Sequence, residues 1–428
     1  MKKSTSPGAK QSTKDEQYEA SFSSPSAPRF TVYSFLDSHK SFVYTDFMRF
    51  LSAILPVFLL TSCVGRVSAP VNDKNEVIDP FRVKAWEIAS SLDDRLLAAQ
   101  ILISSIDGAE NLPENMSDLF TAIPTGGIML FKYNLNANND AIQARNAKIK
   151  SLIMNKSNIP PFIAVDHEGG TVNRFRRGVA DLPAAASYWE IVQKHGRQTA
   201  LAKIETDSLR AGKEINILGL NMNFAPVAEY LFDGNREFMA SRSYGPDPLF
   251  TAQAASAFIH GMEQAGVLCV VKHFPASAGP DPHRSPSVLD IDRAALDNLV
   301  SPFTAVIKNG ARAIMAAHTR ALAIDNKIAS LSPVVMGKWL KEDLAFDGII
   351  ISDDFIMAAA GNISPEEAAV LSVAAGADMI LVWSPHLPKT HQAFISALKD
   401  GRLSRDRLQD AAQRVIYEKL RMGLIDGE

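Results

Sequence analysis

Ionisable side chains stand directly after several short apolar runs of this chain. Carboxylates, imidazoles and amines are the groups that enzymes use as nucleophiles, as proton donors and acceptors, and to hold polar substrates. Four runs end in such groups, which are Asp166-His167-Glu168, Lys272-His273, His318 and Asp353-Asp354. One acidic residue after a strand often only caps the next helix. Four polar strand ends in one chain indicate an active site.

The apolar runs themselves read as parallel strands, because each is short and lacks a polar face. Seven strands are predicted, at 127–131, 162–165, 221–225, 267–272, 313–317, 348–352 and 379–382. Helical stretches separate them, which predicts an α/β fold. Seven or eight repeats over this length favour a single (β/α)8 TIM-type barrel, although an eighth strand is not identified. In a barrel, the polar strand ends would meet at one mouth.

Helices are predicted at 197–218, 248–264, 294–309 and 333–342, and a last amphipathic helix at 402–423 closes the domain. One start is well marked, because Ser364 precedes Pro365 and two glutamates. This order places an N-cap, a proline in the first turn and acidic groups near the helix N-terminus.

The amino-acid composition reduces the number of functions that this chain is expected to have. The 428 residues carry a formal net charge of −3, which gives no indication of nucleic-acid binding. Cys63 and Cys269 are the two cysteines, too few for a disulfide framework. No Cys and His cluster has the spacing of metal ligands, so we expect neither a metal nor another cofactor. The sequence does not indicate an oligomeric state.

The N-terminal region carries the pattern of an exported lipoprotein. Residues 1–47 are rich in Ser, Lys and Pro and are predicted to be disordered, or untranslated if synthesis begins at Met48. Residues 48–63 combine a charged start, a short apolar run and the sequence Leu60-Thr61-Ser62-Cys63. That end resembles a lipobox, which predicts a lipid on Cys63, a tether over 64–80 and a membrane-anchored domain at 81–428 outside the cytoplasm. A short buried helix or an uncleaved anchor is the alternative.

The chain resembles the β-N-acetylhexosaminidase branch of glycoside hydrolase family 3 over residues 91–423. The matching stretches are Ala164-Val165-Asp166-His167-Glu168-Gly169-Gly170, Val172-Asn173-Arg174-Phe175, Asn223-Phe224-Ala225-Pro226-Val227, Ser241-Arg242-Ser243-Tyr244-Gly245, Lys272-His273-Phe274-Pro275, Ile314-Met315 with His318, and Phe346-Asp347-Gly348 leading into Ser352-Asp353-Asp354. Their order and spacing together are specific. The resemblance implies retaining exo-hydrolysis of terminal β-linked N-acetylglucosamine from cell-wall or chitin-type oligosaccharides.

The resemblance also implies the catalytic residues. Asp353 is the expected nucleophile, and a carboxylate at a strand end has the fixed position that a covalent mechanism needs. Asp354 is its rival, but neighbouring residues of a strand face opposite sides, so one of the two is expected to face the site. His283 is the expected acid/base and Asp281 its orienting partner, in place of the second carboxylic acid of many glycosidases.

The resemblance places sugar-binding roles on Asp166, Arg174, Arg242, Lys272 and His273. Arg and Lys only donate hydrogen bonds, which suits hydroxyl and carbonyl oxygens. Besides these, Glu168 is expected to have a structural role in its turn and His167 none, while His318 fits a site position and a core hydrogen bond equally.

One loop departs from the family pattern. Lys-His-Phe-Pro is usually followed by a Gly-His-Gly loop, whereas here Ala276-Ser277-Ala278-Gly279 follows. Alanine disfavours positive φ, so a different loop path and a changed rate or aglycone preference are expected. Three alternatives stay open: a family 3 β-glucosidase or xylosidase, a lipid-anchored glycan-binding protein without catalysis, and a structural lipoprotein.

Overall fold

The computed structural model describes residues 79–427, apart from 176–178, 180, 280 and 358–362. The predicted disordered region 1–47, the signal 48–63 with Cys63, and nearly all of the tether 64–80 lie outside the described residues. Among the helices that are described, none is both long and apolar enough to cross a membrane.

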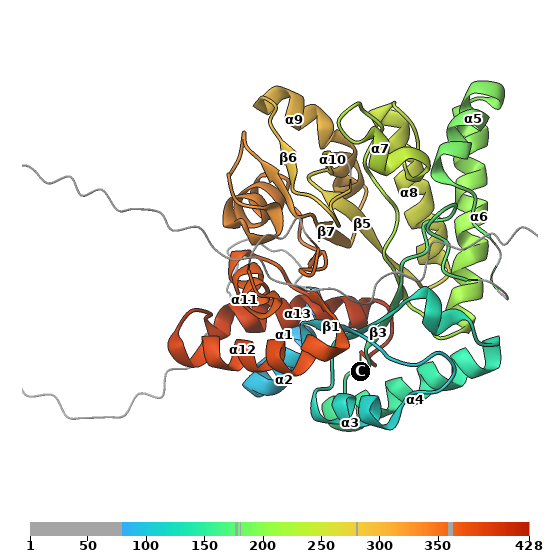
Figure 1. The fold of residues 1–428 in the computed structure, drawn as a ribbon. Helices are drawn as coiled ribbons and strands as arrows, with labels where there is room; N and C mark the ends of the chain where they lie inside the picture. Colours follow the sequence, from blue (N-terminus) through green and yellow to red (C-terminus); the bar gives the residue numbers. More distant parts are fainter. Residues whose placement is uncertain (1–78, 176–178, 180, 280, 358–362, 428) are drawn as a thin grey trace, which may run out of the picture. The chain divides into compact units, whose positions relative to one another are not determined.

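Eight parallel strands form the centre of the domain (Figure 1). They are β1 (Leu102–Ser105), β2 (Gly127–Leu130), β3 (Phe162–Val165), β4 (Met222–Asn223), β5 (Leu268–Phe274), β7 (Ala313–Ala316), β9 (Ile349–Ser352) and β10 (Ile380–Val382). Their order in the sheet is β10-β1-β2-β3-β4-β5-β7-β9. A parallel bridge between Ile351 and Met379 joins the two ends. The sheet is therefore a nearly closed barrel, and the expected (β/α)8 fold is confirmed.

All seven predicted strands are present, with ends that differ by a few residues from the prediction. The eighth is β1, whose short Leu-Ile-Ser-Ser sequence follows directly on the helix α2 (Asp94–Gln100). Because the apolar pattern runs on from helix to strand without a turn signal, the sequence alone does not separate them.

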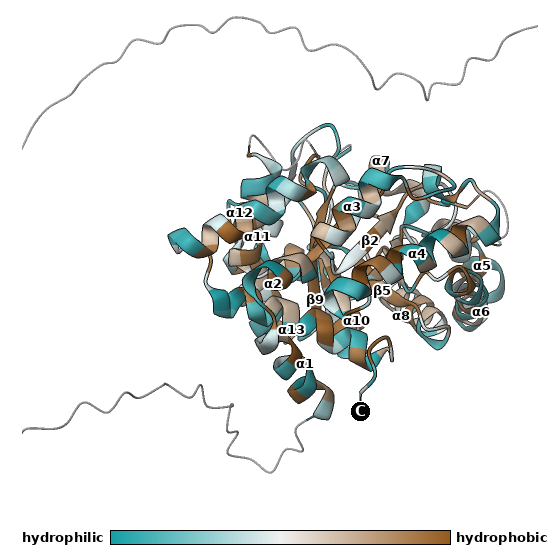
Figure 2. Cartoon of the chain, turned by 90° about the horizontal axis from the view of Figure 1, so that it is seen from below, coloured by the Kyte–Doolittle hydropathy of each residue, from teal (hydrophilic) through white to brown (hydrophobic). Residues whose placement is uncertain are grey.

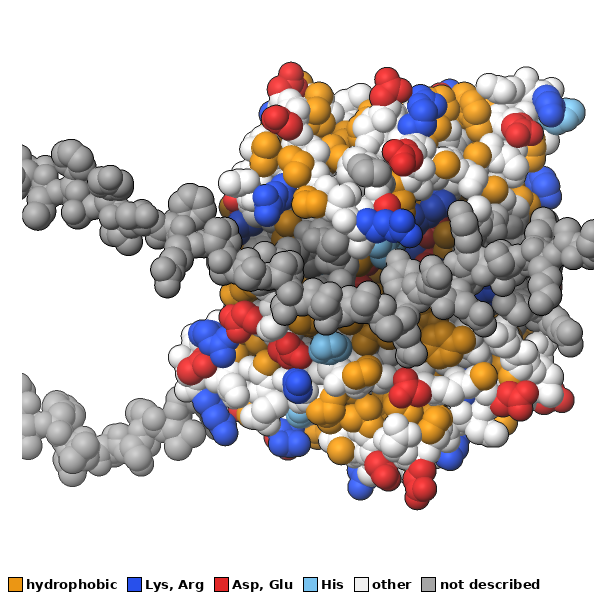
Figure 3. All heavy atoms as spheres, in the orientation of Figure 1, with side chains coloured by type: hydrophobic (Ala, Val, Ile, Leu, Met, Phe, Trp, Pro, Cys, Tyr) orange, Lys and Arg blue, Asp and Glu red, His pale blue; other side chains and the backbone are white. Residues whose placement is uncertain are grey.

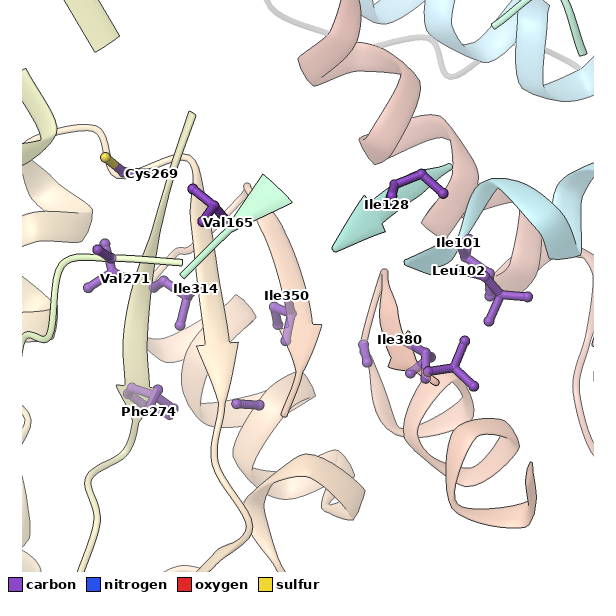
Figure 4. Close-up of a cluster of buried hydrophobic side chains, with 14 of the residues drawn as sticks. Ile101, Leu102, Ile128, Val165, Cys269, Val271, Phe274, Ile314, Ile350 and Ile380 are labelled. Carbon is purple, nitrogen blue, oxygen red and sulfur yellow. The ribbon is translucent and has the colours of Figure 1, made fainter. Parts of the chain in front are cut away.

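Alternation along the strands builds two apolar layers. In β3, Phe162 and Ala164 face the barrel interior, where they pack with Met129, Met222 and Met315. The intervening side chains pack with the helices in a second cluster, of which Figure 4 labels Val165, Ile314 and Ile350. Each strand is thus buried on both faces, which explains why the runs are apolar throughout.

Helices cover the outside of the barrel (Figure 1). In addition to α2, they are α1 (Pro80–Ser91), α3 (Glu114–Ala122), α4 (Asn139–Ser157), α5 (Ala185–His195), α6 (Arg197–Ile217), α7 (Arg236–Met239), α8 (Pro248–Gln264), α9 (Arg293–Leu299), α10 (Ser301–Lys308), the π-helix η4 (Val334–Asp343), α11 (Pro365–Ala375), α12 (Leu387–Asp400) and α13 (Arg405–Arg421). In Figure 2 the strands β5 and β9 are brown, the hydrophobic end of the scale, whereas the surrounding helices carry both brown and teal residues.

The predicted helix starts and ends are largely confirmed. Ser364 caps α11 by accepting a hydrogen bond from the Glu367 N–H, and α13 forms the closing helix. The single helix predicted at 294–309 is wrong, because α9 ends at Leu299 and α10 begins at Ser301. Pro302 lies in the first turn of α10, where a residue without an N–H is tolerated, whereas inside a continuous helix it would remove a hydrogen bond.

A small second sheet lies at the carboxyl end of the strands. Its two strands are β6 (Ser287–Leu289), which follows the loop after β5, and β8 (Thr319–Ala321), which follows β7. Ser287 and Thr319 are paired in register and their hydroxyls lie 2.8 Å apart. This sheet fixes the far end of the loop that carries Asp281 and His283.

Candidate active site

A cavity of about 510 Å³ opens at the carboxyl ends of the barrel strands. Its lining includes all eight residues to which the sequence assigns catalysis or sugar binding, namely Asp166, Arg174, Arg242, Lys272, His273, Asp281, His283 and Asp353. Lys272 and His273 lie on β5, and the other six lie in the connections that follow the strands. On the molecular face in Figure 3, acidic and basic side chains are interspersed.

Asp166 lies at the end of β3 between two cations. Its Oδ1 accepts a hydrogen bond from Lys272 Nζ at 2.6 Å, and its Oδ2 accepts one from Arg174 Nη2 at 2.8 Å. Lys272 is nearly buried, while Asp166 and Arg174 keep part of their surface open to the cavity. Ion pairing fixes all three side chains and presents both acceptors and donors to a polar ligand.

Glu168 is the buried centre of the same charge network. Arg242 donates to both of its oxygens at 2.8 Å, and Lys272 Nζ lies 2.7 Å from Oε1. Burial opposes ionisation of Glu168, but Lys272 and Arg242 hold its pKa well below the usual range. Its structural role thus extends beyond the predicted turn, because it orients the two cations that line the cavity.

His273 forms a second buried pair with Glu229. The Nδ1 atom of His273 lies 2.7 Å from Glu229 Oε1, and the Glu229 side chain is fully buried. A carboxylate in that position accepts the Nδ1–H, so Nε2 is the ring nitrogen left for the cavity.

Asp353 follows the last residue of β9 and is held by its backbone. Its N–H donates to Ala316 O at 3.1 Å, and its Oδ1 accepts the Asp354 N–H at 2.9 Å. Burial by itself raises the pKa of the Asp353 carboxyl, but His318, His273, the Asp354 N–H and Lys272 together lower it below the ordinary value. The carboxylate is therefore ionised at neutral pH, as a nucleophile requires.

Asp354 also lines the cavity, so the expectation that only one of the two aspartates faces it is wrong. The strand β9 ends at Ser352, and strict alternation does not extend to the residues beyond it. Asp354 accepts hydrogen bonds from Trp383 Nε1 at 2.5 Å and from the Ile356 N–H at 3.0 Å. Burial raises the pKa of the Asp354 carboxyl. These two bonds hold Asp354 in place next to Asp353.

His318 combines the two positions that the sequence left open. It lines the cavity, and it also lies within hydrogen-bond distance of Ser330 Oγ (2.6 Å) and Asp354 O (2.9 Å). Burial lowers the pKa of its imidazole. His167, in contrast, is buried outside the cavity lining and packs edge-on to Phe175 with ring centroids 5.2 Å apart. Its pKa is lowered by burial to about 4.

Asp281 and His283 lie on the loop between β5 and β6. His283 Nδ1 is 2.8 Å from Asp281 Oδ1, which also accepts the His283 N–H at 2.9 Å. The His283 side chain is 62% exposed, and its ring lies 6.1 Å from that of Phe238. Although partial burial opposes ionisation of Asp281, the bonds from His283 lower the carboxyl pKa. The pair thus stands preformed at the cavity mouth.

Comparison with known proteins decides the family. The glycosyl hydrolase family 3 N-terminal domain matches residues 96–417 of this chain. The chain belongs to glycoside hydrolase family 3. A beta-hexosaminidase of Methylococcus capsulatus is 35% identical over 282 residues, which are 64% of this chain and 80% of that protein.

Solved family 3 structures resemble the domain as well. A family 3 beta-N-acetylglucosaminidase from Paenibacillus sp. gives a TM-score of 0.72 at 28% identity and covers 79% of this chain. The chain spans 64% of that protein's length. NagZ of Neisseria gonorrhoeae, solved with N-trifluoroacetyl-D-glucosamine, gives a TM-score of 0.64 at 29% identity, covering 74% of this chain and 89% of NagZ. This chain is thus a glycoside hydrolase on a barrel.

Several residues of this family 3 cavity escaped the sequence analysis. Phe131 and Trp383 line it as a stacked pair, with centroids 4.7 Å apart and planes at 10°. Both follow barrel strands directly, but neither is ionisable, so the pattern of polar strand ends does not include them. Glu229 follows the Asn223-Phe224-Ala225-Pro226-Val227 motif, and its role becomes visible only from its contacts with His273 and Ser277.

Proposed function

We propose that this family 3 enzyme removes terminal β-linked N-acetylhexosamine from oligosaccharides with retention of configuration. Asp353 is the nucleophile, His283 the acid/base and Asp281 the residue that orients His283. The observation that carries the proposal is the placement of an ionised carboxylate and a carboxylate-bound imidazole on one sugar-sized cavity. Its volume lies in the range of small-molecule sites.

The reaction follows from these positions. Asp353 attacks the anomeric carbon while His283 gives a proton to the glycosidic oxygen, and the bond to the leaving group breaks. His283 then takes a proton from water, whose oxygen attacks the same carbon and releases Asp353. A histidine suits both steps because its ordinary pKa lies near neutral pH. Neither step needs a cofactor.

Sugar binding is assigned to the charged residues that line the cavity. Asp166 accepts hydrogen bonds from sugar hydroxyls, and Arg174, Arg242 and Lys272 donate to hydroxyl or carbonyl oxygens. His273 presents its Nε2 to the same ligand. Because their mutual ion pairs already orient these groups, little ordering is required when the sugar binds.

Trapping with a slow fluorinated N-acetylglucosaminide tests the nucleophile. We expect the covalent label on Asp353, and a label on any other residue refutes the assignment. Hydrolysis of aryl N-acetylglucosaminide is measured beside that of aryl glucoside, and preference for the glucoside would favour the β-glucosidase alternative. Binding of N-acetylglucosamine without hydrolysis of either aryl glycoside would favour a glycan-binding protein.

The localisation proposal has the sequence as its support. Residues 48–63 have the charged start, apolar run and Leu-Thr-Ser-Cys end of a lipoprotein signal, so Cys63 is proposed to carry the lipid and to tether the domain to a membrane outside the cytoplasm. Mass spectrometry of the mature protein should find a diacylated N-terminal Cys63. An unmodified Cys63 inside a longer chain overturns this part.

A further inference from the structure

Glu229 is a fully buried carboxylate that lies behind the cavity wall, in the segment after β4. Burying an ionised carboxylate is costly unless several donors compensate for the lost water. The described donors to Glu229 come from two residues, His273 and Ser277. Both of these residues line the cavity.

The first pair of contacts fixes the imidazole of His273. Its Nδ1 lies 2.7 Å from Glu229 Oε1, and its backbone N–H donates to the same oxygen at 3.3 Å. Because an ionised carboxylate only accepts, the ring is held in the form that carries a proton on Nδ1. Backbone and ring are thus fixed together, and the ring cannot flip without losing a buried hydrogen bond.

The second pair of contacts fixes the root of the loop that carries Asp281 and His283. The Ser277 N–H donates to Glu229 Oε2 at 2.6 Å, and Ser277 Oγ donates to Oε1 at 3.1 Å. The next residue continues the attachment, because the Ala278 N–H donates to Ser287 Oγ at 2.9 Å. Ser277 stands in the stretch where this chain departs from the usual Gly-His-Gly loop.

We propose that Glu229 is a positioning residue that couples the sugar-binding wall to the acid/base loop. One carboxylate holds His273 in a single orientation and anchors Ser277, so the altered loop begins from a fixed root. This inference rests on the proposed function, since it explains how the binding and acid/base residues of that site are held in place. Ser277 supplies two of the four donors, which gives the departure from the family loop a specific role.

The coupling also reaches Asp353. The groups whose charge acts most on that carboxylate include His318, which lies between β7 and β8, His273 and Lys272 on β5, and the neighbouring Asp354. His273 is one of the groups that lower the pKa of Asp353, and Glu229 holds the His273 ring in place. Replacing Glu229 should therefore loosen His273 and change the electrostatic environment of Asp353.

Steady-state kinetics of Glu229→Gln on aryl N-acetylglucosaminide test the proposal. We expect kcat/KM to fall on the order of 10–100-fold, the loss typical when a carboxylate that orients a metal-bound histidine is replaced. The acid limb of the kcat/KM profile should also move, because His273 is one of the groups that set the pKa of Asp353. Glu205→Gln is the matched control, because Glu205 pairs with His260 at 2.9 Å on the exposed surface, and it should leave both quantities unchanged. Ser277→Ala should lower kcat/KM about fivefold, the equivalent of one neutral hydrogen bond.

Nitrogen-15 NMR of histidine-labelled protein supplies a readout that does not depend on turnover. The His273 signals are identified by their loss in His273→Asn, and in the wild type Nδ1 should carry a slowly exchanging proton. In Glu229→Gln that proton should exchange fast. A wild-type His273 without the Nδ1 proton overturns the inference, as does a folded Glu229→Gln with unchanged rate and pH profile. Absence of turnover by the wild type refutes the proposed function instead, while the NMR result still decides the role of Glu229.

Discussion

Two imidazole–carboxylate pairs line or support one cavity, and they differ in almost everything except the bond between their members. His273 and Glu229 are joined at 2.7 Å with side chains 10% and 0% exposed. His283 and Asp281 are joined at 2.8 Å with side chains 62% and 37% exposed. The first pair sits on a barrel strand and the segment after β4, the second on a loop of the mouth.

The difference follows from what each pair is proposed to do. A group that holds the substrate gains from burial, because a fixed, water-free hydrogen bond needs no reorganisation when the sugar arrives. A group that protonates a leaving oxygen and then activates water must exchange protons with solvent, and the exposed loop allows this. Asp353 resembles the first pair in being fixed, because its backbone N–H is bonded to the barrel strand at Ala316 and its side chain is partly buried. Mutations in the two pairs should therefore have different consequences.

The largest effect on activity is expected at Asp353, the proposed nucleophile. Asp353→Asn removes the nucleophile and leaves the fold intact, so kcat should fall by about 10⁴-fold or more. The rate is measured with aryl N-acetylglucosaminide, and far-ultraviolet circular dichroism checks the fold. A folded variant that keeps more than a tenth of the activity would remove Asp353 from the mechanism.

The next largest effect on activity is expected for His283→Ala, a variant that distinguishes a role in proton donation from a role in substrate binding. With a poor leaving group such as a sugar, we expect a loss of about 10²–10⁴-fold in kcat/KM, and with dinitrophenolate, which needs no proton, a much smaller loss. His260→Ala, an exposed histidine on α8, is the control and should change neither rate. Equal losses for both leaving groups would contradict the acid/base role.

Stability distinguishes the two pairs directly. Glu229→Ala leaves a buried histidine without its partner and should lower the free energy of unfolding by about 3–5 kcal/mol. Asp281→Ala breaks a pair that water already screens and should change it by less than about 0.5 kcal/mol. Urea unfolding at pH 7 measures both values. Similar destabilisation by the two variants would show that the difference in burial between the two pairs does not affect the free energy of unfolding.

The smallest effect concerns pH. Because the charges around Asp353 lower its pKa, its carboxylate stays ionised where an ordinary aspartate, with a pKa of about 3.9, is half protonated. The acid limb of wild-type kcat/KM should therefore lie below about pH 3.9, with activity falling tenfold per pH unit under the limb. Enzyme returned from each pH to pH 7 must regain full activity, which excludes unfolding as the cause. An acid limb above pH 5 contradicts the assignment.

Local sequence patterns predicted most of the fold and most of the ionisable residues that line the site. Short apolar runs such as 162–165 and 313–317 identified strands because both of their faces are buried, and the residue after each run identified the cavity. The patterns failed where two elements meet without a turn, as at β1, and where a proline divides one apolar period, as at Pro302. They also failed for Asp354, because side chains alternate between two faces only within a strand, and Asp354 lies beyond the end of β9.

The sequence by itself determined the fold class, the family and the ionisable groups at the strand ends. These features can be predicted locally, because burial and hydrogen bonding restrict which residue types occur and at what spacing. The partners of those groups were decided by the tertiary structure. Nothing local links Glu229 to His273 and Ser277, or Trp383 to Asp354, because barrel closure brings together residues that are tens of positions apart in the chain. Burial depth, which makes one imidazole pair fixed and the other exposed, is likewise a property of the closed barrel.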